Sequence, residues 1–330
     1  MLHLHALGHF HPENVLSNEF FASLDIGTDE AWILERVGIR NRRTALDLDY
    51  IRQTRNADPR AALEAATCTH AQAGASAARM AIARAGLQPS DIGMVLAGSS
   101  LPDTSVPAEA CNIAAELGMD VPAIDVSSAC TTFFAGIWTL ASMREDALPP
   151  WILLVVPEAY TRAVDYNDRS SAVLWGDASV AAVVSPRVPG AAQIRDPQLG
   201  SRPSDAAKVV VPRTGHFRQD GRAVQGFAIR KTRELLGQRI ESRGASERTL
   251  HFVGHQANLR MLESVCRALG IPENLHHTNV VEFGNTGGAS AASVVSMEWD
   301  HFGASDDIAM VGVGGGLTWA SLLLELGRAS

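Results

Sequence analysis

Three residues in this sequence could form a reactive centre for acyl chemistry: Cys130, His255 and Asn285. Cys130 lies in DVSSAC, where an apolar run ends and a helical pattern begins. Unpaired backbone N–H groups at the start of a helix favour a thiolate, and a thiolate can attack an acyl thioester and hold the acyl group covalently. For a cysteine taken alone, the alternative is a buried side chain that only packs in the core.

His255 ends the apolar run LHFVGH, and Asn285 lies in the glycine-rich segment FGNTGGAS. A neutral imidazole or an Asn amide can hydrogen-bond the carbonyl oxygen of a bound thioester. Backbone N–H groups of the GVGGG run at 312–316 could form an oxyanion hole. Taken singly, His255 also fits a hydrogen-bonded core histidine, and Asn285 a turn residue that serves only the backbone.

Composition places the chain among ordinary α/β proteins. Of its 330 residues, 46% are hydrophobic and 19% charged, which suits one large α/β unit or two fused domains. The formal net charge of −8 argues against general nucleic-acid binding, which needs a basic face. No apolar stretch approaches the roughly 20 residues of a membrane span. The start of the chain, MLHLHALGHFHPENV, does not resemble a signal peptide, so we expect a cytoplasmic protein.

The cysteines show no metal-binding pattern. None forms a CxxC pair or has a histidine at zinc-finger spacing, so we expect no structural metal. Cysteines in a long chain without a signal sequence also indicate a reducing compartment. Apart from Cys130, the cysteines lack a reactive setting and are expected only to pack: Cys68, Cys111 and Cys266.

Periodicity predicts alternating strands and helices. Short apolar runs predict buried strands at 93–100, 122–130, 151–160, 179–185, 208–212, 250–255 and 308–315. Helical spacing predicts helices at 73–86, 131–145, 223–244 and 257–270. Glycines stand where the C-caps of three of these helices belong: Gly86, Gly244 and Gly270.

A pattern that occurs twice along the sequence suggests two similar halves. In each half a predicted strand is followed by a residue that could react and then by a helix. These residues are Cys130 in the first half and His255 in the second. We therefore predict an N-terminal half at 1–185 carrying the Cys and a C-terminal half at 186–330 carrying the His and Asn. The Pro-, Gly- and Arg-rich segment 185–205 is the candidate boundary, with a surface loop inside one domain as the alternative.

The motifs DVSSAC, FVGHQANLR, FGNTGGAS and GVGGGLTWAS closely resemble the active-site motifs of the β-ketoacyl-ACP synthase III family. Segments 28–43 and 167–184 resemble the same family, so the resemblance spans nearly the whole chain in the family's order. It implies a thiolase-like, five-layered αβαβα sandwich of two similar halves, usually assembled as a homodimer.

The resemblance also implies a role for each motif residue. Cys130 would be the acylated nucleophile, and His255 and Asn285 would bind the second thioester and stabilise the enolate left when carbon dioxide departs. The N–H groups of Cys130 and Gly315 would form the oxyanion hole. No tightly bound cofactor is implied, because CoA or phosphopantetheine thioesters are substrates delivered as acyl-CoA or on an acyl carrier protein.

Substrate-binding groups are implied in the same way. Thr28, Trp32 and Arg36 resemble the groups that hold CoA, and Arg169 and Arg260 match basic positions at the mouth of the tunnel. A basic cluster could help to dock an acidic carrier protein, with a solvated helix face as the alternative: Arg230, Lys231 and Arg233.

Three departures from the family pattern point to a specialised relative. Residues 44–72 look longer than the usual link to the next helix, which suggests a lid or a partner-facing flap. Val106 and Val313 stand where relatives often carry Phe, and both changes would enlarge the acyl pocket. We therefore expect medium or long acyl chains, of about eight carbons or more, since each buried methylene is worth roughly 0.8 kcal/mol.

The leading hypothesis is a ketosynthase that forms a carbon–carbon bond by Claisen condensation. The Cys-bound acyl group would react with a malonyl- or β-ketoacyl-thioester, in specialised fatty-acid or polyketide (alkylresorcinol-type) biosynthesis. One alternative is an acyltransferase that passes the acyl group to a hydroxyl or amine. A second is a catalytically silent partner subunit of a condensing enzyme. Retention of Cys130, His255 and Asn285 favours the first hypothesis.

Overall fold

Apolar runs form the strands of one nine-stranded mixed sheet in the computed structural model, which describes residues 1–327. The strand order is β11-β12-β13-β8-β1-β7-β6-β4-β5. The strands in chain order are β1 (Leu2–Phe10), β4 (Met94–Ala97), β5 (Ala123–Asp125), β6 (Ile152–Ala159), β7 (Asp177–Ser185), β8 (Ala192–Ser201), β11 (Thr249–Gly254), β12 (Asp306–Gly314) and β13 (Thr318–Leu326).

The sheet consists of two halves with the same internal order. In one half β4 runs parallel to β6, and β6-β7-β1 continue antiparallel. In the other half β11 runs parallel to β12, and β12-β13-β8 continue antiparallel. The halves join where β1 pairs with β8 over a short stretch, Leu2–Leu4 against 192–194. In this order β4 has the same place in its half as β11 has in the other half. The strand before His255 is β11, whereas the strand before Cys130 is β5, so these two strands are not equivalent.

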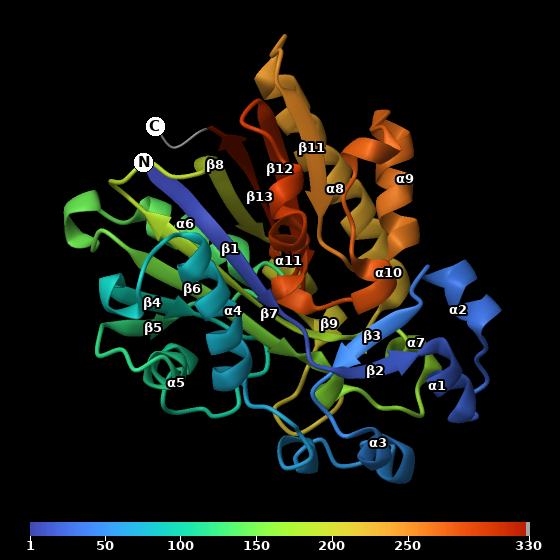
Figure 1. The fold of residues 1–330 in the computed structure, drawn as a ribbon. Coiled ribbons are helices and arrows are strands. Elements are labelled where there is room, and N and C mark those ends of the chain that lie inside the picture. The colour runs from blue at the N-terminus through green and yellow to red at the C-terminus, as the bar shows by residue number, and fades with distance from the viewer. Residues whose placement is uncertain (328–330) are drawn as a thin grey trace.

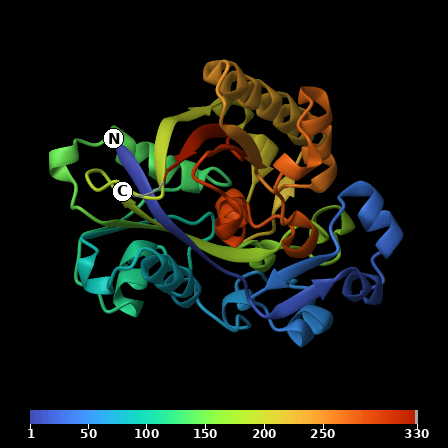
Figure 2. The same ribbon diagram turned by 45° about the horizontal axis from the view of Figure 1, so that its top comes forward.

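Helices fill the space between the halves and cover both outer faces (Figure 1). In the middle, α6 (Thr132–Ser142) and α11 (Ser290–Met297) each pack on strands of both halves. Outside, α4 (His70–Arg84) and α5 (Glu109–Glu116) cover one half, and α8 (Gly221–Arg243) and α9 (Leu259–Leu269) cover the other. Figure 2 shows α11, in orange-red, at the centre of the molecule. The fold is therefore the predicted thiolase-like αβαβα sandwich.

Three strands of the large sheet, β13, β8 and β1, were not among the predicted strands, and they are neighbours in the strand order. β1 alternates His with apolar residues, and β8 falls within segment 185–205, which we expected to be a boundary or a surface loop. The surface-loop alternative was wrong for 192–201, because β8 pairs with both β13 and β1. The predicted strand at 208–212 is reduced to β9 (Val209–Val210), which pairs only with β10 (Arg218–Gln219). The division at residue 185 stays a prediction.

Residues 11–69, between β1 and α4, form a group of short helices and strands beside the central layers (Figure 1). It contains β2 (Asn14–Ser17), α1 (Asn18–Ser23), α2 (Glu30–Arg36), β3 (Asn41–Thr44) and α3 (Leu48–Thr54). The short helices α7 (Arg169–Ala172) and α10 (Val280–Phe283) pack beside it. Within residues 1–327, no helix combines the length and the apolar character needed to cross a membrane.

The long link at 44–72 does not act as a lid in this structure, because none of its residues lines the main cavity. It packs instead on the segment that follows β6. The buried side chain of Asn56 donates hydrogen bonds to the carbonyls of Arg162, at 2.9 Å, and Val164, at 2.8 Å. Its backbone carbonyl bonds the ring of His216 at 2.7 Å. The link thus supports the chain just beyond β6.

Candidate active site

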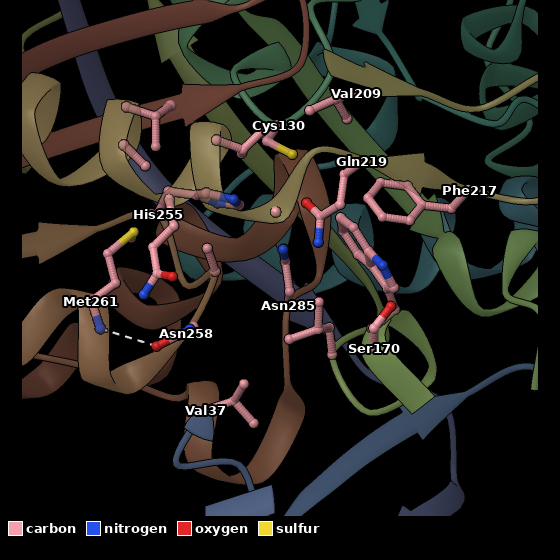
Figure 3. A pocket seen from close by; sticks show the side chains of 18 of the residues that line it. Val37, Cys130, Ser170, Val209, Phe217, Gln219, His255, Asn258, Met261 and Asn285 are labelled. Atoms are coloured by element: carbon pink, nitrogen blue, oxygen red, sulfur yellow. Dashed lines mark hydrogen bonds between the residues drawn. The ribbon is translucent and has the colours of Figure 1, made fainter. Parts of the chain in front are cut away.

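Cys130, His255 and Asn285 line one cavity of about 530 Å³, together with Val313 and Gly315 (Figure 3). Cys130 follows β5 and precedes α6, His255 follows β11, and Asn285 precedes α11. In Figure 3 the side chains of all three labelled residues point toward the same space. The fold therefore brings together the predicted reactive residues from distant parts of the chain.

Cys130 lies on a tight turn. Ala129, just before it, has a φ of 48°, a backbone conformation that L-residues seldom adopt, and α6 begins two residues after the cysteine. The turn brings Cys130 so close to Gly314 that a Cβ on that glycine would lie 3.0 Å from the cysteine nitrogen. The backbone N–H groups of Cys130 and Gly315 both act on the sulfur and lower the pKa of its thiol.

The resting form of Cys130 is the thiol, contrary to the expectation from its helix-start position. Burial raises the pKa of the thiol to about 12, and the negative charge of Glu158 acts in the same direction. Hydrogen bonds from Tyr160 and the two backbone N–H groups only partly oppose this shift in pKa. Acylation therefore has to remove a proton from the sulfur.

His255 is neutral and its orientation is fixed. Burial lowers the pKa of its imidazole to about 4, so the ring carries no charge near pH 7. Its Nδ1 lies 2.7 Å from the hydroxyl of Ser290, and that hydroxyl also accepts the N–H of Gln256 at 3.3 Å. Since the hydroxyl accepts from the backbone, it is free to donate to Nδ1, which leaves the proton of the imidazole on Nε2.

Asn285 presents its NH₂ group to the cavity. Its Oδ1 accepts the N–H of Gly287 at 3.0 Å, so the network assigns Nδ2 to the open side. Its backbone is held by bonds to Leu174, at 2.8 Å, and Gly176, at 3.0 Å. The site thus offers two uncharged N–H donors, from His255 and Asn285, to the same cavity.

Three of the five predicted CoA-binding residues line the cavity mouth. Arg36 and Arg169 lie over the ring of Trp32, with guanidinium carbons 4.7 Å and 5.0 Å from the ring centroid. Thr28 does not line the cavity; its hydroxyl is buried and lacks a hydrogen-bond partner within the described chain. The mouth therefore combines an aromatic surface with two cations, which suits phosphate and adenine groups.

Arg260 and the basic cluster lie outside the cavity lining. Arg260 donates to the carbonyl of Leu34 on α2 at 2.9 Å and pairs with Glu263 at 3.1 Å. It therefore supports the helix that carries Trp32. In the cluster on α8, Lys231 pairs with Glu234 and lies 4.5 Å from the ring centroid of Trp319.

Only one of the two predicted acyl-pocket residues lines the cavity. Val313 is buried in the cavity wall, to which Trp175 and Phe217 also contribute. Val106 is 83% exposed and does not line the cavity, so its placement in the pocket of its own chain was wrong. Residues 101–108 form a loop between β4 and α5, and Val106 is exposed on that loop.

Comparisons with known proteins agree with this geometry. Models of 3-oxoacyl-[acyl-carrier-protein] synthase III match residues 124–203, and models of the C-terminal part of that enzyme match 242–326. The β-ketoacyl-[acyl-carrier-protein] synthase III of Oceanobacillus iheyensis is 32% identical over 325 residues, which is 97% of either chain. The chain belongs to the β-ketoacyl-ACP synthase III family. The resemblance seen in the motifs is thereby confirmed, and the family is one of condensing ketosynthases.

Solved structures of synthase III proteins superpose over nearly the whole chain. The 3-oxoacyl-[acyl-carrier-protein] synthase III of Aquifex aeolicus has a TM-score of 0.86 at 27% identity, covering 98% of this chain and 100% of its own. A priming β-ketosynthase of a polyketide biosynthetic pathway has a TM-score of 0.83 at 27% identity, covering 100% and 97%. Both comparisons support the two-half architecture described above.

Two side chains beside the thiol of this synthase III relative were not predicted: Glu158 and Tyr160. Glu158 lies at the end of β6 and Tyr160 begins the 3-10 turn Tyr160–Ala163. A Cβ on Gly287 would lie 2.2 Å from the Tyr160 ring, and one on Gly288 would lie 2.9 Å from the Glu158 carboxylate. The glycines of FGNTGG therefore make room for these two residues. A carboxylate within an otherwise apolar buried strand was the available signal.

One group of possible metal ligands lies outside the cavity. Ligand atoms of His70, Asp103 and Glu109 lie within 4.8 Å of one another. Arg162 bonds both His70, at 3.0 Å, and Asp103. Because the guanidinium already supplies the positive charge there, this cluster is better explained as a buried ion-pair network that fixes loop 101–108 to the chain after β6.

Proposed function

We propose that the chain condenses an acyl group held on Cys130 with a malonyl- or β-ketoacyl-thioester. The observation that carries the proposal is the pair of neutral N–H donors, His255 and Asn285, facing the same cavity as the thiol. Uncharged donors can bind the carbonyl oxygen of the thioester, and their hydrogen bonds become stronger as negative charge develops on that oxygen in the enolate.

Three steps follow from this arrangement. The Cys130 sulfur attacks the acyl thioester, and the N–H groups of Cys130 and Gly315 stabilise the oxyanion. His255 and Asn285 then bind the carbonyl of the second thioester. In a malonyl thioester the bond to the carboxylate carbon breaks, carbon dioxide leaves and its electron pair forms the enolate, which the two donors stabilise by about 3 kcal/mol each. The enolate carbon attacks the acyl carbon, the new carbon–carbon bond forms, and the Cys130 thiolate leaves.

The substrates that we propose are acyl-CoA and a thioester on an acyl carrier protein, without a tightly bound cofactor. Trp32, Arg36 and Arg169 at the mouth suit the adenine and phosphates of CoA or the phosphate of a phosphopantetheine arm. The relatives are named for an acyl carrier protein, which supports this choice of donor.

We also propose a preference for medium or long acyl chains, and with it a role in specialised fatty-acid or polyketide biosynthesis. Val313 leaves space in the cavity wall that a Phe would fill. Acylation rates measured from acetyl to dodecanoyl thioesters test the proposal, and Val313→Phe should shift the preference toward shorter chains. Fastest acylation by acetyl-CoA would exclude it.

A homodimer would give Val106 a role in the site. Val106 is exposed on its own chain, as is Ile124 on the edge strand β5. We propose that a second copy covers this edge and places Val106 near the acyl pocket of its partner. Sedimentation at several concentrations tests the assembly, and a monomer that condenses at full rate would exclude it.

Intact-mass measurement tests the reaction itself. Wild-type protein should gain the acyl mass with acyl-CoA, and Cys130→Ser should not. Asn285→Ala should still gain the acyl mass but condense about 10² to 10³ times more slowly, because one enolate donor is lost. An adduct on Cys130→Ser would remove Cys130 as the nucleophile. An acyl-enzyme that transfers only to hydroxyls or amines would favour an acyltransferase.

A further inference from the structure

Gln219 is a polar residue of the cavity that the condensation steps above do not use. It lies on β10, and its side chain lines the cavity together with those of Cys130 and Asn285. Figure 3 shows the amide of Gln219 pointing into the space that Cys130 and Asn285 also face. Polar groups that converge on one cavity are the usual means by which a protein recognises its ligand.

The register of the β9–β10 hairpin explains why Gln219 faces the cavity. Gln219 pairs with Val209, and Arg218 pairs with Val210. In an antiparallel pair, opposed residues project from the same face, and successive residues project from opposite faces. Val209 and Gln219 both line the cavity, whereas Arg218 and Val210 do not. The hairpin therefore turns one cross-strand pair toward the substrate and the other away from it.

The position of Val209 shows how near this pair lies to the thiol. A Cβ added to Gly315 would lie 3.3 Å from Cγ1 of Val209. It would also lie 3.7 Å from the Cβ of Ala129, the residue before Cys130. The Cβ atoms of a cross-strand pair are only about 5 Å apart, so the longer side chain of Gln219 extends over the same region.

The amide of Gln219 is not used by the protein itself. It has no hydrogen-bond partner within residues 1–327. Asn258, which also lines the cavity, is engaged by contrast, because its Oδ1 accepts the N–H of Met261 at 3.0 Å. A carboxamide offers two donors and one acceptor, and one that no neighbour holds can turn its NH₂ group toward an oxygen of a bound substrate.

We propose that Gln219 binds an oxygen on the β-carbon of the second thioester and so selects substrates that carry one. The inference rests on the proposed condensation and names a further specificity-determining residue for it. When His255 and Asn285 bind the thioester carbonyl, the α-carbon has to face the acyl group on Cys130. The β-carbon next to it then lies in the space that Gln219 faces. A malonyl thioester offers a carboxylate oxygen there, and a β-ketoacyl thioester offers a ketone oxygen.

An uncharged donor suits both of these oxygens. The cations that line the cavity within the described chain, Arg36 and Arg169, lie at its mouth beside Trp32. A cation beside a malonyl carboxylate would hold it by a charge-assisted bond, about twice as strong as a neutral one, and would oppose the loss of carbon dioxide. An amide orients the same oxygen with a weaker bond.

Gln219→Met tests the proposal, because methionine has a similar length and lacks the amide. The enzyme is first acylated with octanoyl-CoA and then mixed with a malonyl or a 3-oxoacyl thioester, so that the two steps are measured separately. Acylation should keep the wild-type rate, since octanoyl-CoA carries no oxygen on its β-carbon. The kcat/KM for the second thioester should fall by about 10-fold, as expected for one lost neutral hydrogen bond. A loss confined to the malonyl thioester identifies the carboxylate, and a loss confined to the 3-oxoacyl thioester identifies the ketone.

Arg218→Met is the matched control, since it makes the same replacement on the opposite face of the hairpin and should change neither step. Equal losses of acylation and condensation in Gln219→Met would overturn the proposal, because Gln219 would then bind the pantetheine arm that both thioesters share or only shape the cavity. Unchanged condensation with both second thioesters would also overturn it. Neither result would touch the proposed condensation, which Cys130→Ser and Asn285→Ala test separately.

Discussion

Replacing Gly287 by Ala should damage both the stability of the protein and its condensation step. Gly287 lies in the turn between Asn285 and α11, with a φ of 57°. A Cβ there would lie 2.2 Å from Cε2 and 2.8 Å from Cδ2 of the Tyr160 ring. The ring is stacked between this turn and Trp175, so it has little freedom to retreat.

Two costs add up in this variant. An L-residue in the left-handed region costs roughly 1–2 kcal/mol. Forcing a methyl group into a packed interior costs about 1–3 kcal/mol more. The free energy of unfolding should therefore fall by about 2–5 kcal/mol, a large part of a typical 5–15 kcal/mol. Any shift of the turn also moves the N–H of Gly287, which fixes the Asn285 amide, so condensation should slow more than acylation.

Urea unfolding and single-turnover kinetics check this result, and the chain offers a matched control. Gly237 lies inside α8 with nothing within 4 Å of the position of an added Cβ. Gly237→Ala should stabilise the protein by about 0.5–1 kcal/mol, because Ala is the better helix former. If Gly287→Ala unfolds at the wild-type urea concentration and condenses at the wild-type rate, the tight packing of Tyr160 on this turn is wrong.

Three further outcomes are expected. Arg260→Glu should raise the KM for a carrier-bound donor more than it lowers kcat, because the helix that carries Trp32 loses a support, while Arg267→Glu, on the same helix as Arg260, should change KM less; equal KM values would mean that Arg260 does not support donor binding. Asn56→Gly tolerates the φ of 54° and should cost about 1–3 kcal/mol of stability in thermal unfolding, because two buried carbonyls lose their donor; no loss would refute the bracing role of segment 44–72. The pKa of His255 is about 4 in the folded state, below its ordinary value of 6.5, so the unfolded chain binds this proton first and stability falls as pH drops from about 6.5 to 4. In urea titrations over that range, His255→Asn should show a shallower fall; an equal slope would mean that the ring is not buried and neutral.

Local sequence patterns were sufficient for most elements and for the three reactive residues. Apolar runs identified β6, β7, β11 and β12, since a strand buried on both faces needs apolar side chains at every position. Gly270 marked the end of α9, because its φ of 66° suits glycine. Cys130, His255 and Asn285 could be found because each lies in a short motif, and a short motif can be recognised in the sequence without knowledge of the fold.

Non-local contacts decided the rest. The sequence of β8, AQIRDPQLGS, is too polar for its pattern to predict a strand. It forms one because it pairs with both β13 and β1. The sequence does not show that Val106 is exposed, because exposure depends on how the loop that carries it packs on the rest of the chain. Whether Cys130 rests as a thiol or a thiolate depends on opposing effects on its pKa. The helix start, which favours the thiolate, is local in the sequence, whereas burial and the charge of Glu158, which raise the pKa, are not. Tertiary structure alone placed the Tyr160 hydroxyl 4.0 Å from the Cys130 sulfur. The two residues follow different strands and meet only when the sheet and its central helices are packed.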